Sequence, residues 1–141
     1  MIDIQNLVFN TVFNGMRAVY PELEITRGFI EETAKFPCVV IRETGNVPVQ
    51  RTNTDECAEN YTQVTYQVEV YSDKAGTGMS ECRELLALAD EVMQGMKFRR
   101  THMNEPLNIQ RTIFRQYARY TAIAGKGLAE GENVVFQMYR R

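Results

Sequence analysis

The sequence predicts an α+β fold, in which a mostly antiparallel β-sheet carries two main helices packed on one face. Residues 61–71 alternate between a face rich in valine and a face with Gln, Thr and Glu, which is typical of a long strand. Residues 82–96 place apolar side chains at the helical period. Hairpin-like connections between the predicted strands favour antiparallel pairing. We expect a single domain over residues 1–141, because chains of this length form one core.

Residues 3–20 predict the first helix, with Asp3 as its cap and Pro21 as its end. Its apolar side chains form two neighbouring stripes, so the apolar arc is wider than one packing surface needs. The stripes are Ile4, Leu7, Val8, Val12 and Val19, and beside them Phe9, Phe13, Met16 and Tyr20. Two interpretations follow: a helix sunk deep in its own domain, or a helix that also packs on a neighbouring subunit.

The next segments predict strands and one long polar connection. Residues 24–28 predict a short extended piece, and residues 36–43 a strand whose unbroken apolar run indicates burial on both faces. Residues 45–60 form a polar stretch with an acidic cluster. Loops of this length are usually functional or disordered. The alternative is a long hairpin whose flanking strands extend outward and whose tip alone is irregular.

The second half of the chain predicts a helix followed by strands. Ser80 is the expected cap of the helix over residues 82–96, which ends near Gly95. Residues 98–103 alternate weakly and predict a strand, and residues 108–124 predict a second long strand. A glycine-rich loop over residues 125–133 then leads to a last strand over residues 133–140.

The predicted strand over residues 108–124 carries arginines with aromatic residues between them. Three interpretations are open for its Arg111, Arg115, Tyr117 and Arg119: a solvated face whose arginines pair with Glu69 across strands, a protein–protein interface, or a nucleic-acid surface. The net charge of −2 disfavours the last. The predicted subunit or partner contact residues are Phe9, Phe13, Met16, Gln67, Glu69, Arg111, Arg115, Tyr117 and Arg119.

No motif in the sequence predicts a catalytic, cofactor or metal site. Ser72 and Ser80 lie outside any Gly-x-Ser-x-Gly, and His102 is the single histidine. The acidic cluster Asp55, Glu56 and Glu59 lacks the spacing of a calcium loop, so we expect a solvated loop. The odd number of cysteines favours reduced thiols in a cytoplasmic compartment. Of these, Cys38 and Cys82 are expected in the core and Cys57 at the surface.

The order of elements resembles that of the tail terminator, or tail completion, proteins of siphophages and prophages. The matching pieces are patterns of hydrophobicity over nearly the whole chain. They are the helix ending at Tyr20 and Pro21, the strand over residues 36–41, the polar loop, the strand over residues 64–71, the helix over residues 82–96 and the strands over residues 111–122 and 134–139.

The resemblance implies a small α+β subunit that forms a ring, commonly a hexamer, with no enzyme activity and no cofactor. Such a ring caps the tail tube, ends its polymerisation and forms the interface to the head. The implied partners are other copies of the chain, the tail tube protein and head–tail connector proteins. DNA only passes through the lumen, and no membrane is involved. The implied location is the virion tail at its junction with the head, and the host cytoplasm during assembly. A head–tail connector component is the alternative, and a small nucleic-acid-binding module a further one.

Overall fold

The computed structural model describes residues 3–27, 36–48, 61–74, 76–110, 113–126 and 133–136. Within these residues it has two helices and a seven-stranded sheet. The elements are α1 (Gln5–Arg17), β1 (Glu24–Arg27), β2 (Cys38–Pro48), β3 (Tyr61–Ser72), α2 (Gly78–Gly95), β4 (Arg99–Met103), β5 (Leu107–Gln110), β6 (Ile113–Lys126) and β7 (Asn133–Phe136). The strand order is β1-β2-β3-β6-β4, and β5 and β7 also pair with β6. Only β1 and β2 pair in parallel, so the predicted α+β class with a mostly antiparallel sheet is confirmed.

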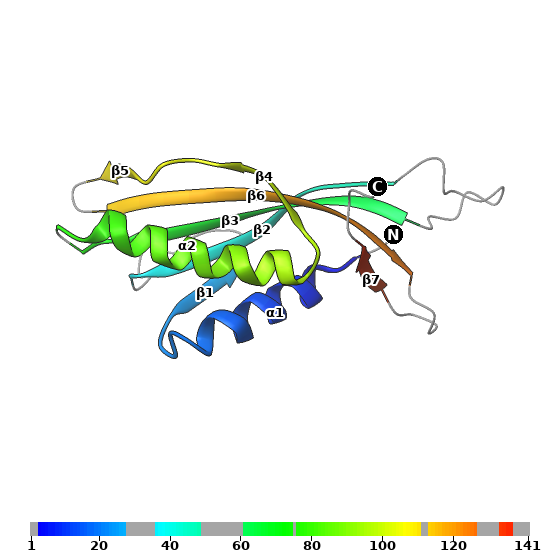
Figure 1. Cartoon of the computed structure of the whole chain (residues 1–141), viewed down its shortest axis with the longest axis horizontal. Coiled ribbons are helices and arrows are strands. Elements are labelled where there is room, and N and C mark those ends of the chain that lie inside the picture. The colour runs from blue at the N-terminus through cyan, green and yellow to red at the C-terminus, as the bar shows by residue number, and fades with distance from the viewer. Residues whose placement is uncertain are drawn as a thin grey trace.

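Both helices cover the same face of the sheet, as Figure 1 shows. The core lies between the two layers. Strand β3 supplies it with alternate residues, as its period of two predicts. The contributing side chains include Val8, Val12, Met16, Val64, Tyr66, Val68, Val70, Leu85, Leu86, Met93, Ala118 and Tyr120, all at most 2% exposed. The run Cys38, Val39, Val40 and Ile41 is buried throughout, which confirms the prediction of burial on both faces of that strand.

The sheet is longer than its helical cover. Strand β2 continues to Pro48, β3 begins at Tyr61 and β6 runs to Lys126. These ends project past both helices on the right of Figure 1. Residues 45–48 of the predicted polar connection therefore belong to a strand, as the hairpin interpretation expects. Residues 49–60 lie outside the described part of the chain.

The prediction of one strand over residues 108–124 is wrong, because the chain reverses within it. Strands β5 and β6 are separate and pair antiparallel, with Leu107 opposite Arg115. The reversal falls between Gln110 and Ile113, where no Gly, Pro, Asn or Asp signals a turn. Arg111 lies outside the described residues. Strands β5, β4 and β7 then cover successive stretches of the same long strand β6.

Helix α1 differs from prediction at both ends and helix α2 at one. Helix α1 begins at Gln5 with Ile4 at the N-cap position, which was predicted for Asp3, although Asp3 Oδ1 accepts a hydrogen bond from the Gln5 backbone N–H at 3.0 Å. Helix α1 ends at Arg17, before Tyr20, and the Arg17 side chain donates a hydrogen bond to the Leu23 carbonyl at 2.8 Å. Helix α2 begins at Gly78, so Ser80 lies inside it and the prediction of Ser80 as cap is wrong. Its end at Gly95 is as predicted.

The start of α2 is fixed by Gly78 and by Glu81. A Cβ at Gly78 would lie 2.5 Å from the Phe114 ring, so only glycine fits without a shift. The Glu81 carboxylate accepts hydrogen bonds from Ser72 Oγ at 2.6 Å and from Lys74 Nζ at 2.7 Å. These bonds tie the first turn of the helix to the end of β3.

The thiols of Cys38 and Cys82 are buried, as predicted, while Cys57 lies outside the described residues. Burial raises the pKa of Cys38 to about 12 and that of Cys82 to about 11. Because the thiolate is the reactive form, a native Cys57→Ser chain should resist iodoacetamide at pH 8. Mass spectrometry should find both thiols labelled in denaturant and neither in the native chain. Rapid native labelling would contradict their placement in the core.

Candidate subunit-contact site

The predicted contact residues on α1 lie against their own domain. Met16 is 0% exposed, so its prediction as a contact residue is wrong: it packs in the core. The rings of Phe9 and Phe13 are half-buried with centroids 5.9 Å apart. The Arg27 guanidinium lies 4.4 Å from the Phe9 ring, and that of Arg17 lies 4.9 Å from the Phe13 ring. The wide apolar arc is therefore largely used within the chain, as the first interpretation of this helix expects.

The predicted contact residues of β3 and β6 meet on the face of the sheet turned away from the helices. The two strands pair so that Gln67 is opposite Arg119 and Glu69 is opposite Tyr117. Tyr71 is opposite Arg115 in the same register. Cross-strand neighbours at this spacing reach one another's side chains. The structure thus brings five of the predicted residues into one cluster.

Glu69 lies at the centre of this cluster. Its Oε1 accepts hydrogen bonds from Arg115, from Gln67 Nε2 at 2.6 Å and from Arg42 at 3.2 Å. Its Oε2 accepts one from the Tyr71 hydroxyl at 3.4 Å. Burial alone would raise the pKa of Glu69, but the hydrogen bond and positive charge of Arg115 outweigh it and the pKa is lowered. The carboxylate is therefore held in its charged form.

Tyr117 organises the other half of the cluster. The guanidinium groups of Arg115 and Arg119 lie 4.8 and 5.5 Å from its ring centroid, and the His102 ring lies 5.6 Å away. Arg119 also donates from Nε to Gln67 Oε1 at 3.0 Å. We call this set of connected side chains the sheet-face network. Its members are Arg42, Gln67, Glu69, Tyr71, His102, Arg115, Tyr117 and Arg119.

The network confirms the prediction that arginines pair with Glu69 across strands. It also corrects the roles of two residues. Gln67 and Glu69 are only 4% and 5% exposed, because the long arginine side chains cover them. They therefore position the arginines and have little surface of their own for a partner. Arg42, His102 and Arg119 are exposed and Tyr117 is half-exposed, so these four residues present the outer surface of the network.

Sequence reasoning missed Arg42, Tyr71 and His102 in this network. Arg42 follows the buried run of β2, and the β2–β3 register places it opposite Gln67. The alternation of β3 places Tyr71 on the same face as Glu69. The sequence of this one strand was therefore enough to identify Tyr71 as a member of the network. For Arg42 the signal required the register, which the sequence does not contain.

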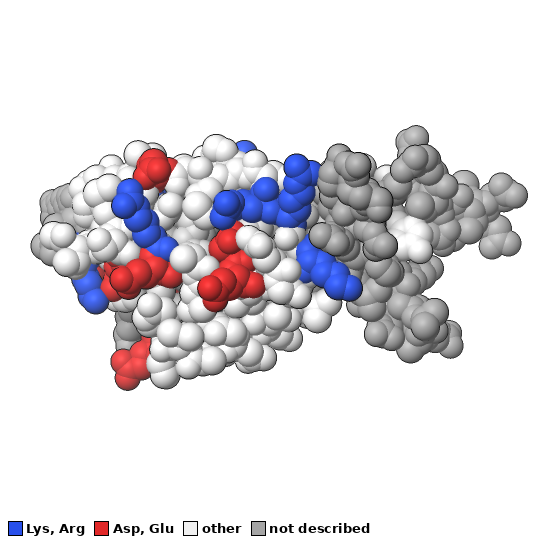
Figure 2. Space-filling model, in the orientation of Figure 1, with Lys and Arg blue, Asp and Glu red and all other residues white. Residues whose placement is uncertain are grey.

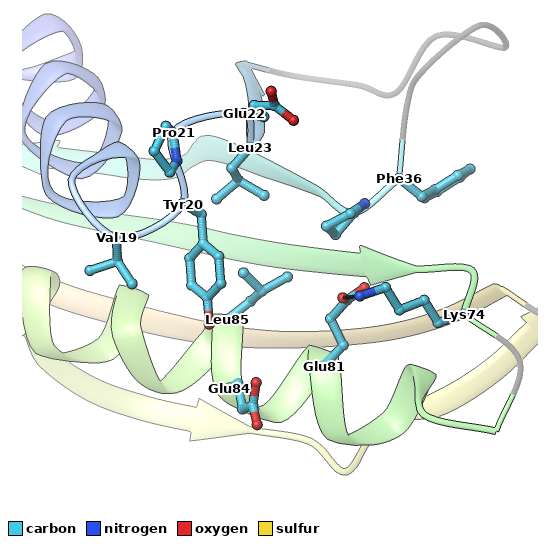
Figure 3. A pocket seen from close by; sticks show the side chains of 11 residues that line it. Val19, Tyr20, Pro21, Glu22, Leu23, Phe36, Lys74, Glu81, Glu84 and Leu85 are labelled. Atoms are coloured by element: carbon cyan, nitrogen blue, oxygen red, sulfur yellow. Dashed lines mark ion pairs between the residues drawn. The ribbon is translucent and has the colours of Figure 1, made fainter.

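An open groove lies between the end of α1 and the start of α2 (Figure 3). It has a volume of about 940 Å³. Val19, Tyr20 and Leu23 form one side, and Glu81 and Glu84 project from α2 on the other. Lys74 pairs with Glu81 on this second side, at the start of α2. The groove thus has an apolar wall and a charged rim, and no contact within its described lining joins a nucleophile to a base.

Two further properties limit the chemistry of the described residues. Among them, no group of three or more His, Cys, Asp or Glu side chains could hold a metal ion, and the acidic cluster Asp55, Glu56 and Glu59 lies outside them. Neither helix in the described ranges has the length and apolar character needed to cross a membrane. On the face seen in Figure 2, basic and acidic side chains alternate, and neither sign forms a broad patch among the described residues.

No protein-family model matches the chain, and no curated protein matches it either.

Proposed function

We propose that this chain is a structural assembly protein of a bacteriophage tail, without enzymatic activity. In this proposal copies of the chain form a ring that caps the tail tube, ends tube polymerisation and forms the interface to the head. The sheet-face network is the observation that carries the proposal. A ring subunit must present preformed contact surfaces to its neighbours, and arginine and tyrosine are enriched in such surfaces.

The organisation of the network supports a contact surface over a binding site for nucleic acid. Arg115 is already engaged by Glu69 and Tyr71, and Arg119 by Gln67 and Tyr117. Such prior pairing fixes the side chains before a partner arrives, which lowers the entropic cost of binding. Phosphate binding would instead favour arginines with unpaired charge. The strand ends that project beyond the helices add surface at one end of the same sheet.

The ring is tested with the purified chain and the tail tube protein of the same genome. We expect the chain to bind tube ends and to stop their growth in electron micrographs. Arg119→Ala and Tyr117→Ala should weaken self-association roughly tenfold or more, as central interface residues do. Lys74→Ala, which removes a surface charge outside the network, is the matched control. A chain that stays monomeric and leaves tube length unchanged would refute the proposal.

A head–tail connector component remains the alternative within the same virion. The two roles differ in the neighbour that the ring touches. Crosslinking within assembled particles should join this chain to the tube protein if it is a terminator. Crosslinks to head proteins alone would favour the connector.

A further inference from the structure

The groove between the end of α1 and the start of α2 presents apolar surface that the described fold leaves uncovered. Val19, on its wall, is 57% exposed, and the neighbouring Tyr20 is half-buried. Figure 3 shows both side chains on the α1 side of the groove. Its volume of about 940 Å³ matches the clefts of roughly 300–1,000 Å³ that take ligands. We call it the α1–α2 groove.

The charges that line the α1–α2 groove are mostly negative. They are Glu22, Glu81 and Glu84 against the single Lys74. Lys74 pairs with Glu81 at 2.7 Å, which leaves two acids over. Among the described residues, no ion pair engages the exposed side chain of Glu22 or Glu84. Complementary charges meet across interfaces, so the groove suits a segment with both apolar and positive side chains.

The chain itself contains a segment of that chemistry. Residues 137–141 read Gln-Met-Tyr-Arg-Arg and follow β7, outside the described part of the chain. Met138 and Tyr139 supply apolar surface, and the next two residues supply two positive charges. Those charges equal in number the two unpaired acids of the α1–α2 groove. Methionine, aromatic residues and arginine are also the residues enriched in protein interfaces.

The segment of one copy falls short of the α1–α2 groove of the same copy. Phe136, the last residue of β7, pairs with Ile123 of β6. At the groove, Ser72 bonds Glu81 and pairs with Phe114 of β6. Nine positions of β6 separate these two points, or about 30 Å at 3.3 Å per residue. Five extended residues span at most about 18 Å. Figure 1 likewise shows β7 and the start of α2 at opposite ends of the sheet.

The edge of β6 is not available to residues 138–141 either. Phe136 occupies the position opposite Ile123, and Arg99 of β4 occupies the position opposite Thr121. Only the position opposite Ala122 is left between them. The other edge of β6 is paired with β3 over its whole length. The segment therefore has no continuing ladder within its own sheet.

We propose that the α1–α2 groove of one copy binds residues 138–141 of a second copy. The two apolar side chains of the segment pack against the wall of Val19 and Tyr20. Its two arginines donate hydrogen bonds to the carboxylates of Glu22 and Glu84. The contact joins unlike surfaces of two copies, and contacts of that kind close into rings. The inference rests on the proposed ring and names one of its contacts.

Charge reversal tests the pairing in the full chain. Sedimentation is measured at about 50 mM salt, where charges are weakly screened. Glu22→Lys together with Glu84→Lys should weaken self-association at least tenfold, because like charges then meet. Arg140→Glu together with Arg141→Glu should do the same. A chain with all four changes should associate within about threefold of the unchanged chain. Equal association in all the variants, or no recovery in the fourfold variant, would overturn the inference.

Two control variants separate this contact from a general effect of charge. Glu91→Lys reverses an exposed acid of α2 outside the α1–α2 groove and should leave association unchanged. Lys74→Ala removes a positive charge from the groove, so it should not weaken the binding of arginines. Glu22 and Glu84 are exposed, so their replacement should move the melting temperature of the monomer by less than about 3 °C.

Disulfide crosslinking tests the geometry independently. In a Cys57→Ser background, one preparation carries Val19→Cys and another carries Tyr139→Cys. Oxidation should crosslink an equal mixture of the two, since a disulfide requires the two Cβ atoms to lie about 4 Å apart. A chain with both cysteines should give a ladder of covalent oligomers. A mixture that does not crosslink, or a disulfide within one chain, would overturn the proposed contact.

This contact and the proposed function fail differently. A ring that forms and caps tubes in spite of all the groove and segment variants overturns only this contact. Groove variants that lose tube ends but keep self-association would assign the α1–α2 groove to the tube protein, which also overturns it. A chain that neither self-associates nor binds tube ends overturns the proposed function, and this contact with it.

Discussion

Replacing Glu69 with alanine should lower the free energy of unfolding by about 3 kcal/mol. The carboxylate is 5% exposed, so its loss leaves Arg115 and Arg42 facing a site without their shared acceptor. Removing one partner of a buried charge pair costs more than removing an exposed one, because the remaining charge stays desolvated. Urea denaturation at pH 7 measures the loss. Glu105→Ala, which breaks an exposed pair, should change stability by less than about 0.5 kcal/mol.

The same residue should give the protein an acid-sensitive stability. Because the pKa of Glu69 is lowered in the fold, its contribution is complete above its unfolded value of about 4.5 and is lost as pH falls through the lowered value. Glu43 should have the opposite effect on stability. Burial raises its pKa, so ionising this carboxyl lowers the stability of the fold as pH rises above about 4.5. Glu43→Gln should therefore be neutral or stabilising at pH 7. If Glu43→Gln proved as harmful as Glu69→Ala, the assigned environments of the two carboxyls would be wrong.

Gly15→Ala should destabilise the protein by roughly 2 kcal/mol, although alanine favours helices over glycine by about 1 kcal/mol. A Cβ at Gly15 would lie 2.8 Å from Cγ2 of Val92, where α1 crosses α2. The valine has little freedom to withdraw, because its β-branched side chain has one preferred rotamer in a helix.

In the control for this prediction, Gly15→Ala should change the stability in the opposite direction. In a Val92→Ala background the obstructing methyl groups are absent, so Gly15→Ala should become stabilising through helix propensity alone. Thermal unfolding of the four variants measures the coupling. Equal effects of Gly15→Ala in both backgrounds would show that the helices do not meet at this point.

The alternation and helical period of the sequence predicted most of the fold. The strand over residues 61–71 and the helix ending at Gly95 lie where their patterns place them, because both bury one regular face. The reversal between Gln110 and Ile113 was missed because no turn residue marks it. The pairing of β5 with β6 determines where the chain reverses. The sequence of one strand does not show which other strand it pairs with.

The sequence predicted several residues of the candidate site, but not how their side chains contact one another. Arg115, Tyr117 and Arg119 share a face because their spacing is two, and that rule holds wherever β6 lies. What the sequence could not show is that these side chains fold back over Gln67 and Glu69 and bury them. Burial of Gln116 was equally hidden, since it lies in a segment without a clean apolar pattern.

The division of the outer edge of β6 among three short strands has a consequence for aggregation. A free strand of 14 residues would offer a long ladder of backbone groups for another chain to extend. Here β5, β4 and β7 occupy that ladder piecewise, and each of these three strands has at most five residues. Edges this short are poor templates for fibril growth. The edge of β6, the longest strand in the described residues, is therefore protected against pairing with another chain.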